Sequence, residues 1–259
     1  MKRLSLVAAL GVLFTLSAYA VDPPKMQLFL IHEETINPSM MSQYEGATKD
    51  LIKAFNDKKM TSPSFMVNTY MTSDMHYLYL TPIANWAQID SIWKDWMSAN
   101  ETVGKEKWAD IMKRSNPTII SYDDAVAARR DDLSYVPENP RLKMEEMPFA
   151  RVDYYYLKPG AEADAEQVAR DYVALFKEKK IPDGFTIYMA MSGHDLPLLV
   201  AVIPAKSPAD FAAVDEKTAA TLGDALRNLQ GRAMALTRRI EHKDSWFRPD
   251  LSYMPVAMK

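Results

Sequence analysis

The chain has 259 residues, with 31 Lys and Arg, 34 Asp and Glu, and no cysteine. Without cysteine there are no disulfide bonds, thiolate metal sites or cysteine nucleophiles, so stability must come from an ordinary hydrophobic core. The mildly acidic balance, with no block of Lys or Arg, argues against a nucleic-acid partner. The length suffices for one large domain or two small ones.

The first twenty residues have the three parts of a secretory signal peptide. Lys2 and Arg3 precede an apolar run over residues 4–16, and Ala18-Tyr19-Ala20 forms a small-residue end. This pattern predicts a signal peptide at 1–20, cleaved after Ala20. Cleavage leaves 29 basic and 34 acidic residues, and no later segment is apolar enough to span a bilayer. The sequence therefore predicts an exported protein, periplasmic or extracellular, without a membrane span.

The first half of the remaining chain alternates between strand and helix patterns. An apolar run at 26–34 predicts a strand, and Asn37-Pro38 predicts the cap and first position of a helix. Apolar residues follow at helical spacing: Met40, Tyr44, Ala47, Leu51 and Phe55. The next predicted elements are strands at 62–71 and 75–82, a helix from Asn85, a helical segment around Trp108 and a strand at 118–122.

The second half repeats this order of patterns. A strand at 150–157 precedes a helix whose apolar stripe is Ala165, Val168, Tyr172 and Phe176. The next predicted elements are strands at 184–191 and 197–204, a helix capped by Ser207-Pro208 and a last strand at 235–242. Both halves therefore have the β-α-β-β-α-β order of a ferredoxin-like module.

A short motif also occurs twice. DLSYVP at 132–137 returns as DLSYMP at 250–255, and AFNDKKM at 54–60 is similar to LFKEKKI at 175–181. Matches in a common order at a similar shift indicate an internal duplication. We expect a first module at 25–140 and a second at 147–259. The motif follows the last strand of each module, where we expect Tyr135 and Tyr253 to pack on the sheets with their hydroxyls bonded to backbone or Asp.

The strands are too apolar for sheets that are covered on one face only. Runs such as LLVAVI at 198–203 are nearly continuous in apolar residues, which indicates burial on both faces. We therefore predict an α+β fold in which two antiparallel sheets pack face to face, with helices outside, as an intrachain dimeric α/β barrel. In element order and duplication the chain resembles the dimeric α/β-barrel superfamily, which includes antibiotic-biosynthesis-monooxygenase-like, haem-degrading-monooxygenase-like and NIPSNAP-like families. The resemblance implies a cavity between the sheets, and no catalytic motif of these families is matched.

Three residues are candidates for a catalytic base. His32 ends the first predicted strand and His76 begins the third, and in this fold these strands are neighbours, so the two imidazoles could face each other beside Glu33 or Glu34. The alternative is that both histidines are hydrogen-bonded at the sheet rim. Asp153 is the third candidate, and it shares one strand face with Arg151 and Tyr155. The alternative here is that Arg151 and Asp153 satisfy each other for structural reasons.

The predicted function has three forms. The first is an exported protein that binds a small, largely apolar molecule between the sheets, with Arg151, Tyr155, Tyr77 and Tyr188 as candidate ligand-binding residues, although such aromatic residues also suit a packed core. The second is a small oxidoreductase or isomerase of the monooxygenase-like type that uses His32, His76 or Asp153 as base. The third is a protein interaction module. No cofactor or metal is predicted, haem being the alternative, and the protein is expected to be a monomer or homodimer.

Overall fold

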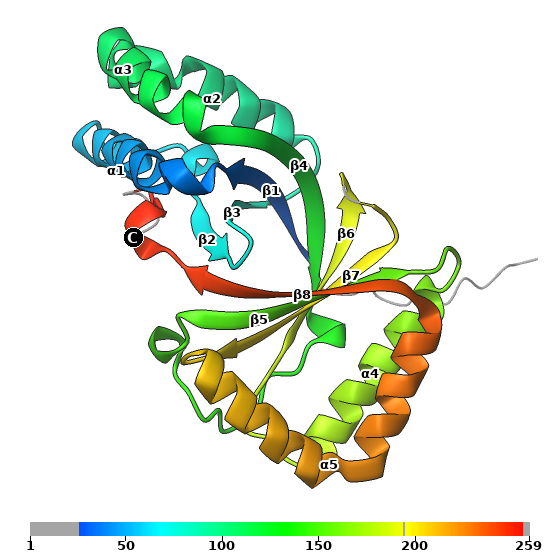
Figure 1. Cartoon of the computed structure of the whole chain (residues 1–259). Coiled ribbons are helices and arrows are strands. Elements are labelled where there is room, and N and C mark those ends of the chain that lie inside the picture. Colours follow the sequence, from blue (N-terminus) through cyan, green and yellow to red (C-terminus); the bar gives the residue numbers. More distant parts are fainter. Residues whose placement is uncertain (1–25, 194, 256–259) are drawn as a thin grey trace, which may run out of the picture.

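A computed structural model of the chain describes residues 26–193 and 195–255, so the predicted signal peptide at 1–20 lies outside the described residues. Eight strands of this part of the chain close into one antiparallel barrel in the order β1-β3-β2-β8-β5-β7-β6-β4 (Figure 1). The strands are β1 Met26–Ile36, β2 Asn68–Thr72, β3 His76–Ile83, β4 Ile119–Arg130, β5 Phe149–Leu157, β6 Thr186–Ser192, β7 Leu198–Ala205 and β8 Thr237–Phe247.

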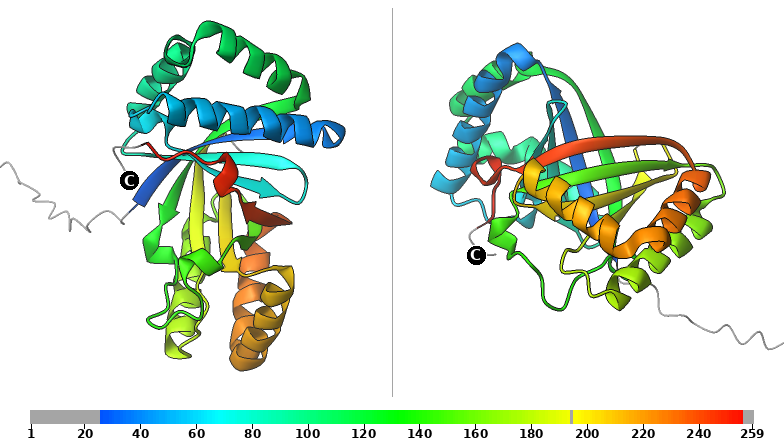
Figure 2. Two further views of the ribbon diagram at one scale, coloured as in Figure 1. Left: turned by 90° about the vertical axis from the view of Figure 1, so that its left-hand side faces the viewer. Right: turned by 60° about the horizontal axis from the view of Figure 1, so that its bottom comes forward.

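The helices lie outside the barrel in two groups. The helices are α1 Met41–Asp57, α2 Gln88–Val103, α3 Lys105–Ser115, α4 Glu162–Glu178 and α5 Pro208–Leu236. Figure 2 shows α1 to α3 on one side of the barrel and α4 and α5 on the opposite side. No helix of the described ranges is long and apolar enough to cross a membrane. The predicted fold class is confirmed: one chain supplies both sheets of a dimeric α/β barrel.

Local sequence explains how the helices begin and bend. Asn37 accepts a hydrogen bond from the backbone N–H of Ser39 in a short 3-10 turn, and α1 continues from that turn. Ser207 caps α5 in the same way through the N–H of Asp210, with Pro208 at the first position. Inside α5, Gly223 has a φ of 55°, which a glycine adopts without steric cost, and the helix bends there.

The two halves of the barrel share one pairing register. The pairing of β1 with β4 shifts at Thr35/Ile36, and the pairing of β5 with β8 shifts at Tyr156/Leu157. The helices α1 and α4 are 17 residues each. With the register shifts and the helices aligned, β1 corresponds to β5, α1 to α4, β3 to β7 and β4 to β8. Equivalent positions of the two halves can therefore be compared directly.

Side chains alternate between the barrel interior and the helix-facing side of each sheet. Leu30 on β1 packs with Ile92 of α2, so its side of the sheet faces the helices. Phe29, its neighbour, contacts Tyr188 of β6 inside the barrel, with ring centroids 5.9 Å apart. Both faces of the strands are therefore covered, as the continuous apolar runs predict.

The repeated DLSYxP motif crosses from one half of the barrel to the other. Leu251, after β8, packs with Tyr44 and Tyr77 of the first half, whereas Leu133, after β4, packs with residues of the second half. The hydroxyl of Tyr253 donates to the carbonyl oxygen of Met60 at 2.7 Å, and that of Tyr135 donates to Ile181 at 2.9 Å. Each half is thus closed by the tail of the other, and the predicted backbone bonds of Tyr135 and Tyr253 are confirmed.

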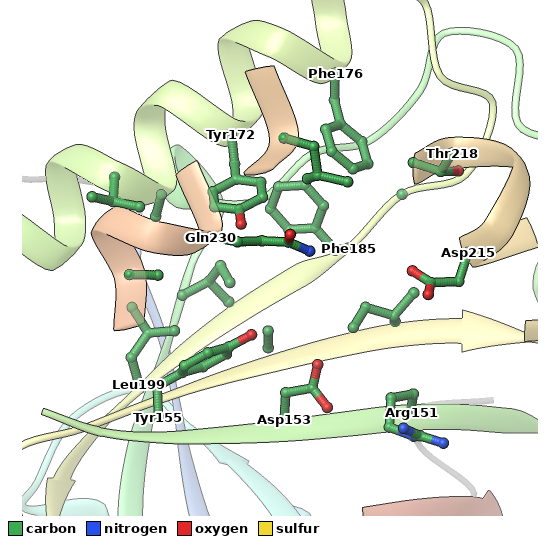
Figure 3. A pocket seen from close by; sticks show the side chains of 18 of the residues that line it. Arg151, Asp153, Tyr155, Tyr172, Phe176, Phe185, Leu199, Asp215, Thr218 and Gln230 are labelled. Carbon is green, nitrogen blue, oxygen red and sulfur yellow. The ribbon is translucent and has the colours of Figure 1, made fainter. Parts of the chain in front are cut away.

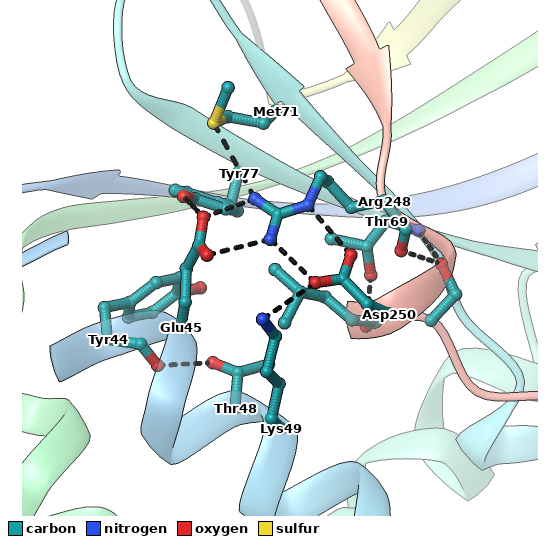
Figure 4. Close-up of polar contacts among 11 residues, drawn as sticks. Tyr44, Glu45, Thr48, Lys49, Thr69, Met71, Tyr77, Arg248 and Asp250 are labelled. Carbon is teal, nitrogen blue, oxygen red and sulfur yellow. Dashed lines mark hydrogen bonds and ion pairs between the residues drawn. The ribbon is translucent and has the colours of Figure 1, made fainter. Parts of the chain in front are cut away.

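An arginine before each motif joins the tail to the opposite α-helix. Arg248 is hydrogen-bonded to Asp250 through Nε at 2.9 Å and to Glu45 of α1 through Nη2 at 2.8 Å (Figure 4). Arg130 makes the equivalent bonds to Asp132 at 2.8 Å and to Glu166 of α4 at 2.7 Å. A planar guanidinium suits two carboxylates at once because it presents its N–H donors in a fixed fork.

Arg130→Gln tests whether the bonds from the tail of the first half to α4 stabilise the fold. The Arg130 side chain is only 9% exposed, and its loss leaves Asp132 without its arginine and Glu166 with only the more exposed Arg170 at 3.3 Å. We expect the free energy of unfolding to fall by about 2–3 kcal/mol, less than for a fully buried pair, because both carboxylates are partly exposed. Urea unfolding measures it.

The matched control is Arg227→Gln, whose ion pair with Asp224 is on the surface. We expect almost no change for this variant. Equal changes in the free energy of unfolding for the two variants would show that Arg130 stabilises the fold no more than an arginine in a surface ion pair.

Candidate functional site

A cavity of about 530 Å³ lies between the helix-facing side of the second sheet and helices α4 and α5. Its walls are mainly apolar, and Figure 3 shows side chains from β5, α4 and α5 pointing into it. Most of the polar lining residues lie on β5, β8 and α5: Arg151, Asp153, Tyr155, Asp215, Thr218, Gln230, Thr237 and His242. Tyr172 of α4, Arg141 and Asp183 complete the polar lining. This cavity lies on the opposite side of the sheet from the barrel interior, where the sequence predicted a cavity between the two sheets.

The cavity exists because small residues replace large ones at equivalent positions. Tyr44 on α1 corresponds to Ala165 on α4, and Tyr79 on β3 corresponds to Ala201 on β7. In the first half the hydroxyls of Tyr44 and Tyr79 are hydrogen-bonded to each other and fill the space between sheet and helix. In the second half both alanines line the cavity. Protein interiors are otherwise close-packed, so the change in volume appears as a pocket.

An aspartate–histidine pair lies at the edge of the cavity. Asp153 of β5 is directly opposite His242 of β8, and the Nδ1 of His242 lies 2.7 Å from Asp153 Oδ1. The Asp153 side chain is 14% exposed and that of His242 is 54% exposed. Burial raises the pKa of Asp153, although the hydrogen bond from His242 and the charge of Arg151 oppose that shift. The pair therefore joins a desolvated carboxylate to a solvent-facing imidazole.

Arg151 does not pair with Asp153. Its Nε donates to Asp244 of β8 at 2.9 Å, and its guanidinium lies 4.8 Å from the ring centroid of Phe211 on α5. The sequence placed Arg151 and Asp153 on one strand face, which is correct, but each residue has its own partner on β8.

Two tyrosine hydroxyls add neutral hydrogen-bonding groups. Tyr155 of β5 and Tyr172 of α4 both line the cavity, and Figure 3 shows their rings directed into it. Burial raises the pKa of Tyr155, with smaller contributions from the charge of Asp153 and from Tyr172, and burial raises the pKa of Tyr172 to about 12. Both hydroxyls are therefore protonated at neutral pH and can donate a hydrogen bond.

The predicted pair of His32 and His76 is wrong. The register of β1 with β3 places His32 opposite Tyr79 and His76 opposite Thr35, so the two histidines are three pairs apart. Because side chains alternate along a strand, this odd offset puts them on opposite faces of the sheet. His32 faces the helices, and His76 faces the barrel interior.

Each of these histidines is held by carboxylates. His32 Nδ1 lies 2.8 Å from Asp124 and its Nε2 lies 3.4 Å from Glu34. His76 is hydrogen-bonded to Glu33 through Nδ1, and its Nε2 lies 3.7 Å from Asp74. Both ring nitrogens of each histidine thus lie within 4 Å of a carboxylate, although His76 Nε2 makes no hydrogen bond within the described chain. Among the described residues no group of three or more His, Asp or Glu side chains is placed to hold a metal ion.

The remaining candidates are split between the two faces. Tyr77 donates its hydroxyl to Glu45 at 2.6 Å beneath α1, and Tyr188 lies inside the barrel against Phe29. Of the predicted site residues, only Arg151, Asp153 and Tyr155 line the cavity together. His242 was missed, although its strand was predicted, because its contact with Asp153 joins residues 89 positions apart.

No protein-family model matches the chain, and no curated protein matches it either. A solved structure of an anthrone oxidase-like protein is similar over 86% of this chain and 91% of that one, with 9% identity and a TM-score of 0.58. The fold is the dimeric α/β barrel. A chlorite dismutase from Candidatus Nitrospira defluvii, in complex with imidazole, covers 86% of this chain and 92% of its own, with 12% identity and a TM-score of 0.49.

Stability is expected to depend on pH through His32. Burial lowers the pKa of His32, but hydrogen bonds and charges from Asp124 and Glu34 outweigh burial and raise the pKa to about 9. The imidazolium therefore stabilises the folded state fully below about pH 6.5, and this contribution is lost as the pH rises through about 9.

The measurement is urea unfolding of wild type and His32→Gln at pH 6 and pH 9.5. We expect the stability difference between the two proteins to be larger at pH 6, and an NMR titration of the His32 ring reports its pKa independently. A stability difference that does not change with pH would contradict the assignment.

Proposed function

We propose that the protein binds a small, largely apolar molecule in the cavity beneath α4 and α5. The observation that carries the proposal is the cavity itself, about 530 Å³ in volume, with aromatic and aliphatic walls and a few polar groups. Ligand sites in proteins commonly have this volume and this balance of side chains. The replacement of tyrosines by Ala165 and Ala201 supports a space that is kept open.

Export and modular organisation belong to the same proposal. Export is supported by the charged start, apolar run and Ala18-Tyr19-Ala20 end of residues 1–20. The division into modules at 25–140 and 147–259 is supported by the repeated DLSYxP motif. The occupant of the cavity would then be a molecule available outside the cytoplasm.

Native mass spectrometry of the protein purified from its own exporting cell tests this function. We expect a chain mass that begins at Val21 and an added small mass that is lost on denaturation. Ala165→Tyr should lose the added mass, because a tyrosine at this position fills the space as Tyr44 does in the first half. An absorbance spectrum of the same sample reports any haem.

The control variant is Ala163→Tyr, which places the same side chain at an exposed position of α4. It should keep the bound mass. A wild-type protein without an added mass, and without saturable binding of 2-(1-naphthyl)ethanol in a titration, would contradict the proposed function.

A second candidate function is proton abstraction from a molecule in the cavity, as in an isomerase or oxidoreductase reaction. The contact of Asp153 with His242 favours it. A desolvated carboxylate with a raised pKa is a stronger base than a solvated one. Asp153 would take the proton from a C–H or O–H bond, and the solvent-facing His242 would link that carboxylate to water. The Tyr155 and Tyr172 hydroxyls would donate to an oxygen on which negative charge develops.

Solvent exchange tests the second candidate. The ligand recovered from the protein is incubated with enzyme in deuterium oxide, and deuterium incorporation is followed by mass spectrometry. We expect Asp153→Asn to slow incorporation by roughly 10²–10⁴-fold, the usual contribution of a general base. Asp164→Asn, an exposed carboxylate on α4, serves as control. Equal rates in wild type and Asp153→Asn would exclude this function and leave ligand binding in place.

A further inference from the structure

The charges at the cavity are not balanced. Arg141 is bonded to two carboxylates, through Nε to Asp183 at 2.7 Å and through Nη1 to Asp210 at 2.9 Å. Arg151 is bonded to Asp244 and covered by the Phe211 ring. Both arginines that line the cavity are therefore neutralised by the protein itself.

Two carboxylates at the cavity, those of Asp153 and Asp215, have fewer hydrogen-bond and ion-pair partners than the arginines. Within residues 26–193 and 195–255, Asp215 has no ion pair and its side chain accepts no hydrogen bond. Asp153 is bonded to His242 through Oδ1, and its Oδ2 has no hydrogen-bond partner among the same residues. No buried side-chain oxygen of the described chain is left without a partner, so Asp153 Oδ2 is open to the cavity rather than sealed. Figure 3 shows both carboxylates at the same end of the cavity, one from β5 and the other from α5.

The first half shows what occupies the equivalent place. His32 corresponds to Asp153, and Asp124 corresponds to His242, so the aspartate and the histidine have exchanged strands. In the first half the residue beneath the helices is the cation, and it is held by Asp124 and Glu34. In the second half that residue is a carboxylate, Glu34 is replaced by Tyr155, and the space in front is open. The second half therefore supplies the anion and lacks the buried cation.

We propose that the ligand of this cavity is an apolar molecule with a protonated amine, whose ammonium group lies between Asp153 and Asp215. The inference rests on the proposed binding function and adds the chemical class of the ligand. An ammonium group fits because it is attracted both by carboxylates and by aromatic ring faces, and Tyr155, Tyr172, Phe176, Phe185 and Phe211 line the same space. The apolar part of the ligand fills the volume that Tyr44 and Tyr79 occupy in the first half.

Three probes of similar size test the charge. They are the cation 2-(1-naphthyl)ethylammonium, the neutral 2-(1-naphthyl)ethanol and the anion of 1-naphthaleneacetic acid. Each is titrated calorimetrically into the mature chain at pH 7, and below they are called the amine, the alcohol and the acetate. We expect the amine to bind roughly fivefold to tenfold tighter than the alcohol, as a partly exposed charge pair with aromatic contacts allows, and the acetate to bind most weakly. Raising the salt concentration should weaken only the amine.

Two variants locate the ammonium group. Asp215→Asn should reduce the affinity for the amine toward that for the alcohol, and Asp153→Asn should reduce the ratio of the two affinities. Asp215 is exposed on α5, so its replacement tests the inference even if Asp153→Asn disturbs the sheet. Glu216→Gln, at the next and also exposed position of α5, is the matched control and should change nothing.

The outcomes separate the inference from the function it rests on. If the alcohol binds and the amine binds no tighter, the cationic ligand is wrong while the binding function stands. If the acetate binds tightest, Arg151 rather than the carboxylates selects the ligand, and the inference is overturned. If no probe binds, the inference is overturned, and the proposed function is contradicted as well when the native protein carries no added mass.

Discussion

The two crossing tails are the constraint on which the rest of the structure depends. Each tail leaves the last strand of one half, and its arginine, leucine and tyrosine contact the other half. Arg248 holds Glu45 of α1, and Arg130 holds Glu166 of α4. In the described part of the chain, hydrogen bonds between strands join the two sheets only along β2–β8 and β4–β6, so the contacts of the tails are what ties each helical layer to the opposite sheet.

This arrangement lets the two halves differ in the side chains beneath their helices while their backbone arrangement stays the same. The fork, the tyrosine bond to a backbone carbonyl and the register shift are the same in both halves. What differs is the volume of the side chains beneath the helices. Tyr44 and Tyr79 of the first half correspond to Ala165 and Ala201 of the second half. The first half is filled by side chains, and the second half, with an equivalent backbone arrangement, has a cavity in the same place.

The sequence predicts the fold well because its signals are local or repeated. Strand and helix patterns depend on near neighbours, and DLSYxP repeats visibly, so the α+β barrel follows from the order of elements. The histidine pair failed because it needed the register of β1 on β3, where an odd offset moves a side chain to the other face. Asp153, Arg151 and Tyr155 were found because alternate residues on one strand share a face. His242 and the cavity needed the pairing of β5 with β8 and a comparison of volumes between the two halves.

The crossing tails also impose an order on assembly. Glu45 and the arginine that binds it are 203 positions apart, and the hydroxyl of Tyr253 reaches back 193 positions to Met60. A chain synthesised from its N-terminus therefore cannot complete the cover of α1 until residues 248–253 have emerged. The second helical layer meets its tail early, since the segment that covers it, after β4, precedes it in the chain. The half that carries the cavity thus has its covering tail before its own last strand, β8, is made, whereas the packed half must wait for residues 248–253 at the end of the sequence, a slow step of the kind that long-range contacts impose on folding.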